Sequence, residues 1–250
     1  MEFAILGDIH GRTLSPFEEY LDAERPERVY CTADFDLKES YREFLDITDD
    51  YRTEIVPGNH EHAAKEALDL RSDSLNEIGI EAQELAEAWQ DSEYHDLLER
   101  VDDPRKQTHQ FELNEQNAVL IHGALAGDTS DFRKCPENRE FMWNRLQADM
   151  EPLNFSGPNT DYHEANFDQM EDMRYNVMFR SHDHKPEVTY RKPGRGVVTL
   201  EPNDGSTFVM RKERPYTVTT GAWRDGWFVE GDTEPENRDE PVIKYHKEEF

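Results

Sequence analysis

Asp8 and His10 are separated by one residue and follow a short apolar run, residues 3–6, that is long enough for one buried strand. In an extended segment, residues two positions apart point to the same side, so the carboxylate and the imidazole can face one metal ion. A single pair of this kind is weak evidence, because short loops also use Asp and His to form turns. The pair gains weight only if matching side chains follow later strands.

Comparable polar side chains follow four further apolar runs along the chain. They are Asp34 and Asp36 after residues 29–32, Asn59 and His60 after residues 54–56, His122 after residues 118–121, and His182 and His184 after residues 176–179. Carboxylate, amide-oxygen and imidazole donors without a thiolate suit Mn²⁺, Fe or Zn²⁺, and this donor set does not select among them. Each Asp or His alone has a simpler explanation in turns or caps, and Asp36 is well placed to cap the helix expected from residue 37.

Helical patterns alternate with the first three apolar runs, and this arrangement decides where the polar side chains meet. Apolar residues keep helical spacing over residues 16–21 and 37–45, so residues 3–56 are predicted to fold as β-α-β-α-β. Such units pair their strands in parallel through right-handed crossovers, which gathers the carboxyl ends of the strands at one sheet edge. Short alternating strands between residues 188 and 245, separated by Gly and Pro, predict an antiparallel second sheet.

Residues 62–105 interrupt this pattern with two or three amphipathic helices that are rich in Glu and Asp. We expect one domain over residues 1–250, with a helical insertion or cap at about residues 62–105. This stretch could act as a small cap beside the polar cluster. It could equally be a solvated helical layer with no role in recognition.

The chain carries 28 Lys and Arg residues against 56 Asp and Glu residues, which gives a net charge of −28. The acidic residues are spread along the whole sequence, as in proteins of halophilic cytoplasm, where a large net charge maintains solubility. A partner-specific acidic surface is the alternative. Duplex nucleic acid is not a favoured partner, because its binding normally requires a basic face. No apolar run approaches membrane-spanning length and no signal-peptide pattern is present, so we expect a soluble, cytoplasmic protein without a membrane partner.

Taken in order, Asp8-x-His10, Asp34, Asn59-His60, His122 and His182-x-His184 resemble the calcineurin-like metallophosphoesterase superfamily. The pattern of that superfamily runs D-x-H, G-D, G-N-H-D/E, H and G-H-x-H, and its counterparts here span residues 7–184. The resemblance implies an α/β fold, a four-layer αββα sandwich of two mixed β-sheets flanked by helices. It also implies a dinuclear metal-dependent phosphoesterase, in which a metal-bridging hydroxide attacks the phosphate ester of a small substrate.

The resemblance further implies a role for each of these side chains. One divalent metal ion is expected on Asp8, His10 and His184, and a second on Asn59, His122 and His182, with Asp34 as the bridge between them. Mn²⁺ is the expected metal, with Fe and Zn²⁺ as alternatives. His60 is expected to orient the phosphate and to protonate the leaving oxygen as a general acid. Glu61 either orients His60 or begins the helix that follows, and we favour the second role.

Two positions depart from the superfamily pattern. Ala33 and Ser181 stand where glycine usually precedes the bridging aspartate and the histidine pair, and both are expected to adopt backbone angles open to non-glycine residues. The protein-phosphatase branch carries an arginine where this chain has Pro57, so a protein-phosphatase assignment is not supported. Arg12 and Arg180 are weaker candidates for binding a substrate phosphate, and Arg180 could instead pair with local acidic residues.

Two other functions are compatible with the motifs. A nuclease-type phosphodiesterase would use the same metal ligands, but it would need a basic groove that the acid-rich sequence does not suggest. A non-catalytic module that binds metal or phosphate would keep the ligands and lack turnover, and the intact His60 argues against it.

The histidines outside the motifs, among them His62 and His163, have no strand-end context and are expected at the surface.

Overall fold

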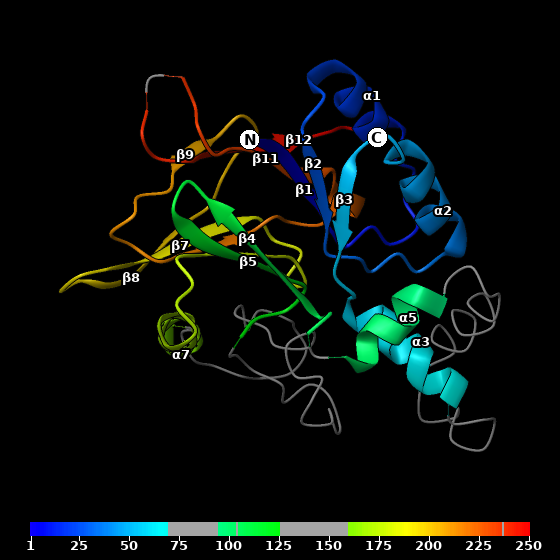
Figure 1. The fold of residues 1–250 in the computed structure, drawn as a ribbon, viewed down its shortest axis with the longest axis horizontal. Coiled ribbons are helices and arrows are strands. Elements are labelled where there is room, and N and C mark those ends of the chain that lie inside the picture. The colour runs from blue at the N-terminus through cyan, green and yellow to red at the C-terminus, as the bar shows by residue number, and fades with distance from the viewer. Residues whose placement is uncertain (70–94, 104, 126–159, 237) are drawn as a thin grey trace.

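We describe the fold from a computed structural model, which places residues 1–69, 95–103, 105–125, 160–236 and 238–250 (Figure 1). This part of the chain forms two six-stranded β-sheets and five α-helices. The first three helices alternate with strands, whereas strands dominate after residue 176.

The first sheet has the strand order β3-β2-β1-β11-β12-β9. Its parallel half consists of β1 (Glu2–Leu6), β2 (Arg28–Cys31) and β3 (Arg52–Ile55), which are connected by α1 (Ser15–Glu24) and α2 (Lys38–Ile47). Val29 in β2 is paired with Ala4 in β1 on one side and with Thr53 in β3 on the other. The β-α-β-α-β unit predicted from the sequence is therefore confirmed, and three parallel strands end at the same edge.

The later strands divide between the two sheets. The antiparallel half of the first sheet contains β11 (Trp227–Asp232), β12 (Val242–Lys247) and β9 (Thr207–Val209). The second sheet runs, in spatial order, through β4 (Thr108–Leu113), β5 (Gln116–Ile121), β6 (Val177–Arg180), β10 (Tyr216–Thr219), β7 (Glu187–Lys192) and β8 (Gly196–Leu200). The strands between residues 188 and 245 were expected to form an antiparallel second sheet, but they divide between the two sheets, and β10 pairs in parallel with β6. Both sheets are mixed.

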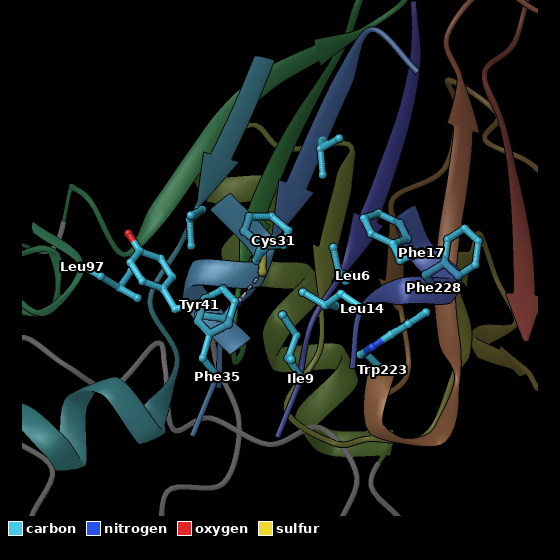
Figure 2. Close-up of a cluster of buried hydrophobic side chains, with 14 of the residues drawn as sticks. Leu6, Ile9, Leu14, Phe17, Cys31, Phe35, Tyr41, Leu97, Trp223 and Phe228 are labelled. Carbon is cyan, nitrogen blue, oxygen red and sulfur yellow. Dashed lines mark hydrogen bonds between the residues drawn. The ribbon is translucent and has the colours of Figure 1, made fainter. Parts of the chain in front are cut away.

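Alternation along β1 explains how the layers are built. Phe3 and Ile5 point to one face, where they pack with Phe179 and other buried residues of the second sheet. Ala4 and Leu6 point to the other face and pack against the helices. The cluster on this helix side joins Leu6 and Cys31 to aromatic side chains of α1, β11 and the turn before β11 (Figure 2). Cys31 is a free, buried thiol.

The opposite face of the second sheet is covered by α7 (Thr160–Asp172). Phe167 and Met170 of this helix pack against Val119 and Met178 of the sheet. The order is therefore helices, sheet, sheet, helix, which confirms the four-layer αββα sandwich (Figure 1). The carboxyl ends of β5 and β6 belong to the second sheet and those of β1, β2 and β3 to the first.

Two helices of the predicted insertion are described, α3 (Asn59–Asp69) and α5 (His95–Asp102), and they lie side by side. Leu97 and Leu98 pack into the cluster on the helix side of the first sheet, and the Arg100 guanidinium donates to the Ile55 carbonyl at 2.8 Å. Residues 70–94 lie outside the described residues, so the role of a cap stays a prediction. Within the described segments, every helix is too short or too polar to span a bilayer.

Candidate metal centre

The polar side chains predicted from the sequence meet where the two sheets face each other. Asp8 follows β1, Asp34 follows β2 and Asn59 follows β3, all at the parallel edge of the first sheet. His122 and His182 follow β5 and β6, which are neighbouring parallel strands of the second sheet. The packing of the sheets therefore brings five loops, far apart in sequence, to one place.

The first group of donor atoms consists of Asp8, His10 and His184, whose ligand atoms all lie within 4.8 Å of one another. His10 Nε2 is 3.2 Å from His184 Nε2, and Asp8 Oδ1 is 3.8 Å from His184 Nε2. Two imidazole nitrogens and a carboxylate oxygen at this separation are arranged as ligands of a single cation.

The second group consists of Asp34, His122 and His182, and it is completely buried. His122 Nε2 lies 3.1 Å from His182 Nδ1 and 3.3 Å from Asp34 Oδ2. The side-chain oxygen of Asn59 is 2.8 Å from the same His122 nitrogen, so Asn59 joins this group. Asp8 Oδ1 is 3.8 Å from His122 Nε2 as well, which places Asp8 between the two groups.

The two carboxylates each leave one oxygen available for a metal ion. Asp8 Oδ2 accepts the backbone N–H of His182 at 2.8 Å, and Asp34 Oδ1 accepts that of His60 at 3.0 Å. Asp8 Oδ1 and Asp34 Oδ2 are buried and make no hydrogen bond to the described residues. A buried carboxylate oxygen without a partner is costly, and a bound cation would remove that cost. The donor set and its burial therefore fit divalent metal ions.

Burial and neighbouring charges shift the pKa values of these carboxylates in opposite directions. Burial raises the pKa of Asp8 to about 6, with a further increase from Asp34 and a partial offset from His122. Burial would also raise the pKa of Asp34, but the imidazoles of His122 and His60 hold that pKa well below its usual value. Asp34 is therefore the more strongly ionised of the two carboxylates.

Asp36 contributes to the centre in a way that the sequence analysis missed. The helix α2 has Leu37 at its N-cap and no side-chain cap hydrogen bond, so the expected capping role of Asp36 was wrong. Its carboxylate instead accepts from His10 Nδ1 at 2.8 Å and from His60 Nδ1. The Nε2 atom of each imidazole is thereby directed into the centre, as carboxylate partners commonly do for metal-binding histidines.

The environment of His60 favours the protonated imidazole. Burial alone would lower the pKa of His60, but the carboxylates of Asp34 and Asp36 raise it to about 10. His60 Nε2 lies 3.9 Å from Asp34 Oδ2, at the border of the second group. His60 is therefore placed beside the metal groups, where neighbouring carboxylates favour the protonated form that a general acid requires.

Glu61 holds the loops that carry Asp34 and Asn59. It lies in the first turn of α3, as favoured, and its buried carboxylate accepts the backbone N–H groups of Asp34, Phe35 and Gly58 at 3.1, 3.0 and 2.9 Å. Gly58 has to be glycine at this point, because a Cβ atom there would lie 2.0 Å from Asp34 Oδ1. These contacts fix the position of the Asp34 carboxylate between the two sheets.

Several metal-centre residues adopt left-handed backbone conformations although they are not glycine. They are Asp8, His10, Ala33, Asp34, Asp36, His182 and His184, with φ angles of 48–63°. Each costs about 1 kcal/mol relative to an ordinary conformation, and such strain is concentrated at functional sites. The φ angle of Ala33 lies in the small left-handed region that non-glycine residues can adopt at this cost. Ser181 has no positive φ, and its hydroxyl accepts from Thr32 Oγ1 at 2.7 Å.

Arg180 is fully buried at the end of β6, where it contacts the loops that carry His122 and His182. Its guanidinium donates to the Gly123 carbonyl at 2.6 Å, to Thr219 Oγ1 at 3.3 Å and to the Asp183 carboxylate. Asp183 lies between the ligand candidates His182 and His184. The structure therefore favours the local acid pair over a contact of Arg180 with substrate phosphate. Arg12, by contrast, is exposed.

Two histidines expected at the surface are buried, His62 with 2% and His163 with 5% of its surface exposed. His163 Nε2 lies 3.5 Å from Glu187 Oε1. Burial, together with the charge of Arg180, lowers the pKa of His163 to about 4. The neutral imidazole is therefore the form that fits the folded protein.

Acidification should destabilise the fold through His163. An unfolded histidine titrates near pH 6.5, so between about pH 6.5 and 4 the unfolded chain binds a proton that the folded chain rejects. At pH 5 this linkage removes about 2 kcal/mol of unfolding free energy relative to pH 7. Urea titrations of the wild type and His163→Gln at both pH values measure it. An equal loss of stability in the two proteins would show that His163 is not the group responsible.

Comparison with known proteins gives the following matches. A family model described as the calcineurin-like phosphoesterase superfamily domain matches residues 1–226. The fold is similar to a metallophosphoesterase from Sphaerobacter thermophilus, with a TM-score of 0.65, 16% identity, and coverage of 100% of this chain and 89% of that chain. It is also similar to the hypothetical protein PH1004 from Pyrococcus horikoshii OT3, with a TM-score of 0.58, 12% identity, and coverage of 100% and 88%. No curated protein sequence matches significantly.

Proposed function

Because this chain belongs to the calcineurin-like phosphoesterase superfamily, we propose that it is a metal-dependent hydrolase acting on a small phosphate ester. The observation that carries the proposal is the convergence of two donor groups around buried oxygens of Asp8 and Asp34 that make no hydrogen bond to the described residues. A solely structural cluster would be expected to satisfy these oxygens with protein hydrogen bonds.

The proposed ligands follow the two groups. Asp8, His10 and His184 would hold one divalent ion, and Asn59, His122 and His182 the other. Asp34, which lies in the second group, would be shared between the ions, as its place in the superfamily pattern implies. When bound, such a pair of ions supplies charge stabilisation for the phosphoryl group and lowers the pKa of a coordinated water. Mn²⁺ is the metal we propose, with Fe and Zn²⁺ as alternatives.

The side chains themselves contribute orientation and a proton. Asp36 holds Nδ1 of His60, which leaves Nε2 to donate its proton to the leaving oxygen of the ester. The neutral imidazole would then regain a proton from solvent, since more than a third of the His60 side chain is exposed. Asp36 also accepts from Nδ1 of His10, so one carboxylate orients both a proposed metal ligand and the proposed general acid.

Turnover assays with chromogenic substrates test the proposal. The protein is loaded with Mn²⁺ in concentrated KCl, because the acidic composition resembles that of salt-adapted proteins. We expect hydrolysis of p-nitrophenyl phosphate to be faster than that of bis-p-nitrophenyl phosphate. Turnover of the diester alone would support the nuclease-type phosphodiesterase instead. Absence of both activities in protein that retains its metals would leave a binding module.

A further inference from the structure

A wide hollow of about 830 Å³ opens beside His184, which also belongs to the first metal group. Its walls come from the loop that carries His184, from the turn η3 (Trp223–Asp225) and from the end of β12. Four exposed basic side chains line it, namely Arg12, Lys185, Arg224 and Lys247. We call these four side chains and the hollow between them the basic groove.

The charge of the basic groove differs from that of the chain as a whole. The sequence has 56 acidic residues against 28 basic ones, whereas four of each line the groove. Lys185 is paired with Glu201, and Arg224 Nε lies 3.8 Å from its sequence neighbour Asp225. The lining is therefore formally neutral, whereas the chain as a whole is strongly negative, and two of its four cations are close to carboxylates.

The other two cations, Arg12 and Lys247, are held by aromatic rings. The Arg12 guanidinium lies 5.2 Å from the centre of the Phe250 ring, and Lys247 Nζ lies 5.3 Å from that of Trp227. A ring face orients a cation without neutralising it. Among the described residues, neither cation has a carboxylate at ion-pair distance. Phe250 is half exposed and packs edge-on against the buried Trp223, with ring centres 5.2 Å apart.

We propose that the basic groove binds a second anionic group, which the leaving group of the substrate carries. The preferred substrates are then compact phosphate esters that carry a further phosphate or carboxylate. His184 lines the groove and belongs to the first metal group, so one small molecule can reach both. A long polyanion would be repelled by the net charge of −28 on the chain as a whole. The inference rests on the proposed function, because the groove can bind a leaving group only when the metal centre holds the phosphoryl group of the same substrate.

Binding to the metal-free protein tests the groove independently of catalysis. Metal is removed with a chelating resin, and inorganic pyrophosphate is titrated into the protein by calorimetry. The Arg12→Gln/Lys247→Gln double variant should bind about tenfold more weakly or worse, since each charged hydrogen bond contributes about 1.5–3 kcal/mol. Arg195→Gln, an equal loss of charge in the exposed β7–β8 turn, is the control and should bind as the wild type does. Equal affinity of the wild type and the double variant, or no binding by the wild type, would overturn the proposal.

Substrate selectivity gives the second arm. The ratio of kcat/KM for 4-carboxyphenyl phosphate to that for phenyl phosphate should fall about tenfold in the double variant relative to the wild type. An unchanged ratio would count against the groove while leaving the phosphoesterase activity established. Pyrophosphate binding that depends on Arg12 and Lys247, without turnover of either ester, would support the groove and refute the proposed function.

Discussion

Asp34→Asn is expected to lose bound metal and to reduce turnover about a thousandfold or more. The variant keeps the shape of the side chain and an oxygen that can accept the N–H of His60, but it removes the negative charge from the buried oxygen Oδ2. A metal ion supplies several kcal/mol of charge stabilisation to a phosphoryl transfer, and each 1.36 kcal/mol corresponds to a factor of ten. Metal content after dialysis, measured by mass spectrometry, and turnover of p-nitrophenyl phosphate check both parts.

Asp46→Asn is the matched control, because Asp46 is an exposed residue of α2. It makes the same chemical change in the helix that follows the Asp34 loop. The control should keep its metal and its activity. If Asp34→Asn retained two ions per chain with wild-type turnover, Asp34 would not be a bridging ligand and the proposed centre would have to be redrawn.

The first half of the fold and most of the centre could be predicted from the sequence because their signals are local. A buried run followed by a polar pair marks the end of a parallel strand, and parallel strands must end at one edge. Asp8, Asp34, Asn59, His122 and His182 each follow such a run, and the structure brings them together. At these positions the local sequence pattern and the topology of the sheet indicate the same location, so the local pattern was sufficient to predict the centre.

The arrangement of the later strands could not be predicted in the same way. Alternation with a period of two identifies a strand and its two faces, but it does not specify the sheet to which the strand belongs. The strands β10 and β11 are separated by a short turn and still lie in different sheets. The strand β4 was missed altogether, because only Leu113 of its six residues is fully buried.

The missed contributions of Asp36 and His163 have a common cause. Each depends on a partner that is distant in sequence, namely His10 and His60 for Asp36 and Glu187 for His163. The local spacing predicted Asp36 as a helix cap. Its carboxylate instead contacts His10 and His60, which are distant in sequence. The spacing of Asp34 and Asp36, which repeats the i, i+2 spacing of Asp8 and His10, was the one signal that could have identified it.

His60→Ala is expected to lower turnover about a hundredfold or more while the metals stay bound, because it removes the proposed general acid and none of the proposed ligands. The loss should depend on the leaving group. A nitrophenolate departs without full protonation, whereas an alkoxide needs the proton that His60 Nε2 would supply. The defect should therefore be larger for an alkyl phosphate than for p-nitrophenyl phosphate. Phosphate release from both substrates, with metal content measured on the same samples, provides the comparison.

His109→Ala is the control for loss of an imidazole, since His109 lies on β4, away from the metal groups. Asp36→Asn adds a graded test, because it keeps the imidazole of His60 and weakens the charge that raises its pKa. The same change weakens the contact with His10 Nδ1, so metal content is measured on the same samples. This variant should lose less turnover than His60→Ala and should show the same dependence on the leaving group. An equal loss for both leaving groups in His60→Ala would mean that His60 positions the phosphate without donating a proton. Unchanged turnover would remove His60 from the mechanism and leave the protonation of the leaving oxygen to another group.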